Sequence, residues 1–163
     1  MAPPNQDSNP AGQKKSLARV LVVEDHPDIG LAMRLMLARY DIAASQATGG
    51  RQALERLETE SFDLILLDNN MPDMNGIELC RLLKADKRLK QIPVIFVTSR
   101  FDDAFRDEVR RLGAVDHIHK PFTLVPFVTC VSRHLGLETT VVEDARRAGL
   151  IQPVIAAVGA LLS

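Results

Sequence analysis

Five short apolar segments alternate through most of this chain with segments whose apolar residues recur at helical spacing. Most of these apolar segments are nearly continuous, as expected for strands buried on both faces of a parallel sheet. Parallel strands need crossover connections, so the alternation predicts an α/β fold. The expected strands are residues 18–25, 41–47, 62–68, 92–99 and 114–120, and the expected helices are residues 26–40, 51–60, 76–86, 102–113 and 123–136.

The order of the strands follows from the size of the units. Right-handed crossovers leave few topologies, and the flavodoxin-like order 2-1-3-4-5 is the natural one for five units. We therefore expect a five-stranded parallel sheet with helices on both faces, formed by residues 17–136. Residues 1–16 are polar and rich in Pro, Asn, Gln and Lys, so they are expected to be a disordered tail. Residues 137–163 are interpreted as a helical extension.

Composition argues against a nucleic-acid partner and bears on the location of the chain. The chain has 163 residues with 20 basic and 21 acidic side chains, which gives no electrostatic reason to expect nucleic acid. Trp is absent and aromatic residues are few, which argues against a base-stacking surface. Cys80 and Cys130 are not at metal or redox spacing, and we interpret both as free thiols in apolar helices. No signal peptide is recognised, so a cytoplasmic protein is the simplest expectation.

Polar side chains stand where four of the five expected strands end. Glu24 and Asp25 close the first strand, Asp68 the third, Thr98 the fourth and Lys120 the fifth. The carboxyl ends of parallel strands share one edge of the sheet, and ligands bind there, where the strand order reverses. Each residue alone is explained as well by a cap, a turn or an ordinary surface position. Together they predict one pocket.

The chemistry of that pocket follows from its charges. Three carboxylates in one site repel each other unless a cation neutralises them, and acidic oxygen ligands suit Mg²⁺. With such an ion and Lys120 nearby, Asp68 can stay ionised as a nucleophile, and aspartate carboxylates do form covalent phosphoryl intermediates. The transferred phosphoryl oxygens would face the metal, Lys120 and the Thr98 hydroxyl. The pattern therefore predicts an acceptor of phosphate.

The segments VVEDH, LLDNNMPDMNG, VIFVTS and HKPF, in this order and spacing, resemble the receiver domain of two-component response regulators, of the single-domain chemotaxis-regulator type. The resemblance covers residues 17–136. It implies that Asp68 is the phosphoacceptor. It also implies that Mg²⁺ is bound by Asp25, by Asp68 and by the backbone carbonyl of Asn70, with Glu24 held through water.

The same resemblance gives roles to residues around the acceptor. Thr98 and Lys120 would contact the phosphoryl group, and the peptide bond between Lys120 and Pro121 would be cis. In the family, the threonine hydroxyl moves toward the phosphoryl group and an aromatic ring three residues before the lysine turns inward behind it. That position is His117 here. Two interpretations stay open: a tolerated ring on an edge strand, or a ring whose titration makes activation pH-sensitive.

The resemblance also implies partners. The phosphoryl group would come from a phosphohistidine on a sensor histidine kinase or a histidine phosphotransfer protein, and the output would be a downstream protein. Residues 137–163 include an apolar stretch too short to span a bilayer, so no membrane insertion is expected. This stretch could pair in a homodimer, which we favour, pack on the receiver or lie in a partner's groove. A receiver fragment of a longer regulator or hybrid kinase is the alternative.

Two other functions compete with this interpretation. A phosphatase of the haloacid-dehalogenase type also forms an aspartyl phosphate, but it needs a second acid two positions after the nucleophile, where this chain has Asn70. A receiver that serves only as a scaffold would be expected to lack one of the acids or the lysine. Because all of them are present, we expect a phosphoacceptor domain rather than a metabolic enzyme or a scaffold.

Overall fold

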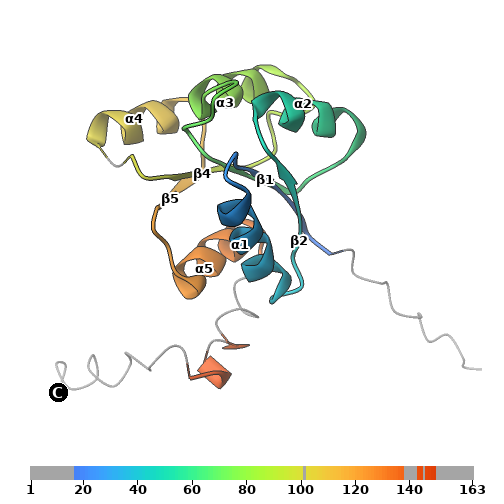
Figure 1. Cartoon of the computed structure of the whole chain (residues 1–163), viewed down its shortest axis with the longest axis vertical. Helices are drawn as coiled ribbons and strands as arrows, with labels where there is room; N and C mark the ends of the chain where they lie inside the picture. The colour runs from blue at the N-terminus through green and yellow to red at the C-terminus, as the bar shows by residue number, and fades with distance from the viewer. Residues whose placement is uncertain (1–16, 101, 138–142, 145, 150–163) are drawn as a thin grey trace, which may run out of the picture.

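The computed structural model describes residues 17–100, 102–137, 143–144 and 146–149 (Figure 1). The predicted tail of residues 1–16 and most of the predicted extension of residues 137–163 lie outside the described residues. Within the described part, five strands alternate with five helices, as predicted. The strands are β1 (Arg19–Val23), β2 (Ala43–Ala47), β3 (Leu64–Leu67), β4 (Val94–Thr98) and β5 (Asp116–His119). The helices are α1 (Pro27–Ala38), α2 (Gly50–Thr59), α3 (Gly76–Ala85), α4 (Asp103–Arg111) and α5 (Leu124–His134).

The strands form one parallel sheet in the order β2-β1-β3-β4-β5, which confirms the predicted topology. The order reverses at β1, which lies between β2 and β3. Helices α2, α3 and α4 cover one face of the sheet, and α1 and α5 cover the other (Figure 1). The reversal point and the carboxyl ends of the strands therefore lie at the edge where the sequence predicts the site.

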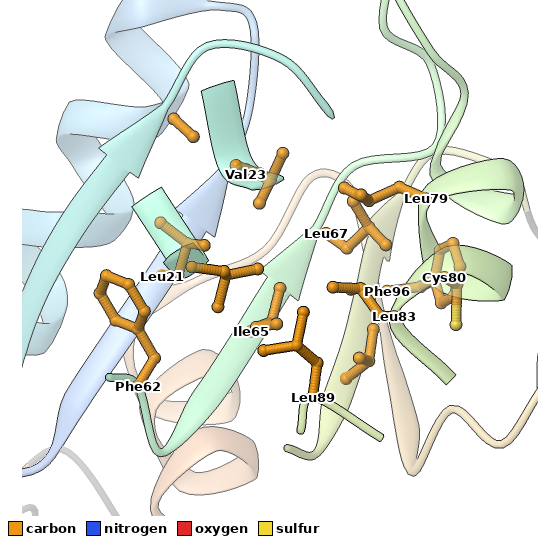
Figure 2. Close-up of a cluster of buried hydrophobic side chains, with 14 of the residues drawn as sticks. Leu21, Val23, Phe62, Ile65, Leu67, Leu79, Cys80, Leu83, Leu89 and Phe96 are labelled. Atoms are coloured by element: carbon orange, nitrogen blue, oxygen red, sulfur yellow. The ribbon is translucent and has the colours of Figure 1, made fainter. Parts of the chain in front are cut away.

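Each face of the sheet has its own hydrophobic cluster, because successive side chains of a strand point to opposite faces. In β3, Ile65 and Leu67 face the cluster beneath α2, α3 and α4, whereas Leu64 and Leu66 face the cluster beneath α1 and α5. Figure 2 shows the first cluster, in which Ile65 lies among apolar side chains from neighbouring strands and from α3. All four residues of β3 are buried, which explains the unbroken apolar run before Asp68.

β2 is the least apolar of the predicted strands, yet it pairs with β1 over its full length, from Ala43 to Ala47. Four of its five residues are half-buried, as expected for a strand at the edge of a sheet. Both cysteines are buried and unpaired, as predicted. Among the described residues, no helix combines the length and the apolar character needed to cross a membrane.

Candidate functional site

The predicted site residues stand at the carboxyl ends of adjoining strands. Asp68 directly follows β3, and its backbone N–H donates to the carbonyl of Val23 in β1 (2.9 Å). Thr98 is the last residue of β4, and its carbonyl accepts the backbone N–H of Lys120, which directly follows β5 (2.9 Å). The backbone hydrogen bonds between the strands therefore fix the backbone positions of these residues. Residues far apart in the sequence are brought to one edge, as predicted.

A half-buried lysine lies between two buried carboxylates. The Nζ of Lys120 is 2.5 Å from Oε2 of Glu24 and 3.4 Å from Oδ1 of Asp68. The exposed fractions of the three side chains are 16% for Lys120, 0% for Glu24 and 5% for Asp68. Opposite charges at these separations attract strongly where solvent is excluded. Lys120 thus holds the ends of β1, β3 and β5 together, with Glu24 as its nearest partner.

The environment of Asp68 disfavours its negative charge. Burial raises the pKa of the Asp68 carboxyl, the charge of Glu24 raises it further, and the Lys120 ammonium together with a hydrogen bond from the Asn70 backbone opposes this rise. The balance is a net upward shift, because burial is the largest of these effects. The site therefore disfavours the ionised form of Asp68.

Asp25 and His26 complete the acidic end of β1. The imidazole Nδ1 of His26 lies 3.1 Å from Oε1 of Glu24 and 3.2 Å from Oδ1 of Asp25. The hydrogen bond to Glu24 raises the pKa of His26, and the charges of Asp25 and Glu24 add to this shift. The contact with Asp25 lacks hydrogen-bond geometry: its Oδ1 is buried and has no hydrogen-bond partner within the described part of the chain.

These groups suit a hard divalent cation. A buried carboxylate oxygen of Asp25 has no hydrogen-bond partner among the described residues, and burial raises the pKa of the Asp68 carboxyl. Carboxylate oxygens are the donors that Mg²⁺ prefers. The residues present therefore fit the predicted ion. The parts predicted for the Asn70 carbonyl and for a water-mediated Glu24 stay predictions.

The proposed phosphoryl contacts and switch residues lie on the two strands at the far end of the sheet. Thr98 is 1% exposed, and its Oγ1 accepts a hydrogen bond from the backbone N–H of Arg100 (3.1 Å). His117 is half-buried on β5, in register with Phe96 of β4. The peptide bond between Lys120 and Pro121 is cis, as expected. The switch roles of Thr98 and His117 stay predictions.

Some residues that hold the site in place could not be assigned from the sequence. The Asp73 carboxylate accepts the backbone N–H groups of Gly50 (3.2 Å) and Arg51 (3.0 Å), so the loop after β3 caps the start of α2. The side-chain amide of Gln46 donates to the backbone carbonyl of Glu24 (3.0 Å). These partners are 22 or 23 positions apart. Sequence periodicity carries no signal for such contacts.

The family model for the response regulator receiver domain matches residues 20–132. The chain belongs to the receiver family of response regulators. Over 120 residues, or 74% of its length, the receiver is 36% identical to a probable cyclic di-GMP phosphodiesterase from Vibrio cholerae, and it covers 27% of that protein. The receiver spans less than half the length of the curated relatives that it matches.

Solved structures agree with this assignment. The chemotaxis protein CheY4 of Vibrio cholerae aligns with a TM-score of 0.70 and 27% identity, over 72% of this receiver and 98% of that chain. The receiver domain of sensor histidine kinase PA1611 from Pseudomonas aeruginosa aligns with a TM-score of 0.68 and 25% identity, over 74% and 99% of the two chains. That structure is described with a magnesium ion coordinated in the active-site cleft.

Proposed function

We propose that the receiver accepts a phosphoryl group on Asp68 from a phosphohistidine donor and passes the signal on through a protein contact. The observation that carries this proposal is the Asp68 carboxylate itself, buried at the carboxyl end of β3 and 3.4 Å from the Lys120 ammonium. A carboxylate in this position is a nucleophile with a neighbouring cation. The matching family supports the same role.

The transfer is a displacement at phosphorus. A carboxylate oxygen of Asp68 forms the new bond to phosphorus, the bond between phosphorus and the donor's imidazole nitrogen breaks, and the imidazole leaves as a neutral ring after taking up a proton. Lys120 and the Thr98 hydroxyl would hold the transferred oxygens. A bound Mg²⁺ would supply charge neutralisation at the phosphoryl oxygens. Asp25, Asp68 and the Asn70 carbonyl would hold it directly, and Glu24 through water.

An apolar groove next to Lys120 supports a protein donor. It is lined by Ile29, Ala32 and Met36 of α1, and by Pro121 and Phe122 after β5. A groove of this kind accepts the apolar face of a partner helix. We propose that a sensor histidine kinase or a histidine phosphotransfer protein docks there and presents its phosphohistidine to the acidic site.

The output of the receiver is proposed to involve Thr98, His117 and a downstream protein. Thr98 and His117 are the proposed switch, because they lie on the neighbouring strands β4 and β5 beside the acceptor. A downstream protein is the proposed recipient of the signal, and residues 137–163 are proposed to join two copies of the chain. Because the receiver spans less than half of its curated relatives, a place within a longer regulator or hybrid kinase is the alternative. The two unpaired cysteines fit a cytoplasmic location.

The test is phosphorylation by a small donor. Wild type, Asp68→Asn and Asp107→Asn are incubated with acetyl phosphate and Mg²⁺, and intact mass is measured. Asp107 is an exposed carboxylate on α4 and serves as the matched control. We expect wild type and Asp107→Asn to gain one phosphoryl group, whereas Asp68→Asn gains none. Equal phosphorylation of all three proteins would refute Asp68 as the acceptor. Chelation of Mg²⁺ should abolish the gain in wild type.

A further inference from the structure

A second group of potential metal ligands lies away from the acidic site. Oδ2 of Asp116 is 2.9 Å from Nε2 of His134 and 3.5 Å from Sγ of Cys130. One ligand atom from each of the three residues lies within 4.8 Å of the others. All three side chains are buried or half-buried. A carboxylate, an imidazole and a thiol thus converge at one point.

The fold explains this convergence. Cys130 and His134 are four positions apart on α5, so their side chains lie on the same face of the helix, one turn apart. Asp116 is the first residue of β5, and α5 packs over this side of the sheet. Lys120 follows the other end of β5, so the cluster and the acidic site lie toward opposite edges of the sheet. The two groups are separate features.

We propose that Asp116, Cys130 and His134 form a binding site for a divalent transition metal of the zinc class, with solvent in the fourth position. Thiolate and imidazole ligands favour Zn²⁺ or Co²⁺ and disfavour Mg²⁺. Metal–ligand bonds of about 2.0–2.3 Å in a tetrahedron place the ligand atoms roughly 3.3–3.7 Å apart. The separations of 2.9 and 3.5 Å reach this spacing with small side-chain movements. The exposed fractions of Asp116 (27%) and His134 (22%) leave room for a water.

Metal binding would have to displace protons that the cluster holds without metal. Without metal, the Cys130 thiol donates to Asp116, and burial together with the Asp116 charge raises the pKa of Cys130 to about 11. Metal binding would release the thiol proton to solvent. His134 would bind through Nε2, with the ring proton on Nδ1 in place of the Nε2 proton that faces Asp116 without metal. One competing cation is present: a guanidinium nitrogen of Arg133 lies 3.4 Å from Oδ2 of Asp116. The Arg133 side chain is 54% exposed and can turn into solvent.

A bound metal would tie the last turn of α5 to the first residue of β5. The ligands come from two elements that meet only in the folded chain, so metal binding would add to the free energy of folding. The cluster without metal is already hydrogen-bonded, which explains how the receiver folds in either state. The site gives the α5 side of the domain a response to metal that is independent of phosphorylation.

The test titrates the reduced, chelator-treated full chain with Co²⁺ and with Zn²⁺ in excess Mg²⁺, so that the acidic site is occupied. We expect about one equivalent of Co²⁺ to give sulfur-to-cobalt charge-transfer absorption, and Zn²⁺ to displace it. Cys130→Ala should lose this absorption. His134→Gln should bind at least about tenfold more weakly, because even outer-shell changes cost that much.

Matched controls separate this site from the others. Cys80→Ala alters the other buried thiol, and His26→Asn alters the histidine of the acidic site. Both should bind Co²⁺ like wild type. Absence of a thiolate band in wild type, or equal affinity in Cys130→Ala, would overturn the proposal, as would binding lost only in His26→Asn. Zn²⁺ should also raise the unfolding temperature of wild type but not of His134→Gln, whose half-exposed position at the end of α5 tolerates the change.

Discussion

Asp68 carries a charge that the folded receiver accommodates poorly without metal. It is buried and shares Lys120 with the fully buried Glu24. Burial, followed by the Glu24 charge, raises the pKa of Asp68 above its unfolded value. A group with a raised pKa binds its proton more tightly in the folded state. Its contribution to stability is therefore most favourable at low pH and is lost as the pH rises through the folded-state pKa.

Replacing Asp68 with Asn should stabilise the metal-free receiver at neutral pH, because the amide keeps the shape of the side chain without its charge. We expect the unfolding temperature to rise by about 3 °C. The gain should shrink as the pH falls through the folded-state pKa of Asp68 and vanish near the unfolded value of about 4. Thermal unfolding followed by circular dichroism between about pH 4 and 8 measures both effects.

Mg²⁺ provides an internal control for this experiment. The ion should raise the unfolding temperature of wild type more than that of Asp68→Asn, because only wild type keeps the full set of carboxylates. The surface change Asp107→Asn should produce a much smaller shift. A gain in Asp68→Asn that persists undiminished at about pH 4 would show that its origin is not the charge.

The sequence identified the candidate site residues, but it did not show which of them form ion pairs. Glu24, Asp25, Asp68, Thr98 and Lys120 could be identified because each lies next to an apolar run in the sequence. The ion pair between Glu24 and Lys120 joins residues 96 positions apart. It depends on where the end of β5 lies in the folded sheet, which local pattern does not specify.

At the scale of elements, the start of α3 lies directly against the backbone of Asp68. A Cβ added to Gly76 would be 2.5 Å from the carbonyl oxygen of Asp68 and 2.9 Å from Cα of Asn69. The side chain of Asn75 caps the helix by accepting the backbone N–H of Glu78 (2.8 Å). Glycine at position 76 therefore allows the first residue of α3 to lie against the backbone that directly follows β3.

Gly76→Ala should force this contact apart. We expect a loss of about 2 kcal/mol in the free energy of unfolding, measured in urea, because the obstructing atoms are backbone. Phosphorylation by acetyl phosphate should also slow, since the Asp68 backbone must move.

Gly136→Ala is the matched control for Gly76→Ala. Gly136 has a φ of +69° and open space around it, so alanine should cost about 1 kcal/mol through backbone strain alone. Its phosphorylation rate should be that of wild type. Wild-type stability in Gly76→Ala would contradict the steric argument.

Helices and strands with a strong apolar periodicity were predictable from the sequence. The residues at which they begin and end were less predictable. The sequence located all five strands, including the half-buried β2, but extended β1 to residues 18–25 where the structure has Arg19–Val23. Glu24 and Asp25 lie just beyond the end of β1, although the Glu24 backbone N–H still donates to the carbonyl of Ala47 in β2 (3.0 Å). The shared helix face of Cys130 and His134 was also readable from their four-residue spacing.

At the scale of the whole molecule, the sequence leaves one apolar segment to be covered. Residues 149–163 include a nearly continuous apolar stretch that lies mostly outside the described residues. We predict that a chain ending after residue 138 is monomeric, whereas the full chain forms a dimer, because the two copies would bury this stretch against each other. Multi-angle light scattering during gel filtration gives the mass of each.

A double change, Leu161→Ser with Leu162→Ser, tests the same point in the full-length chain. Both substitutions lower apolar character without shortening the protein, so they should weaken the dimer as truncation does. An identical mass for the full and shortened chains would rule out self-association through this segment.

The sequence by itself determined the α/β class, the strand order and the edge of the sheet at which the reactive groups gather. It could do so because apolar periodicity is local and parallel connections have a fixed hand. Tertiary structure decided how Lys120 is shared between Glu24 and Asp68, how Asp73 caps α2, and which residue meets Cys130 and His134. Such contacts depend on the register between elements distant in the chain, and that register is set only when the whole core packs.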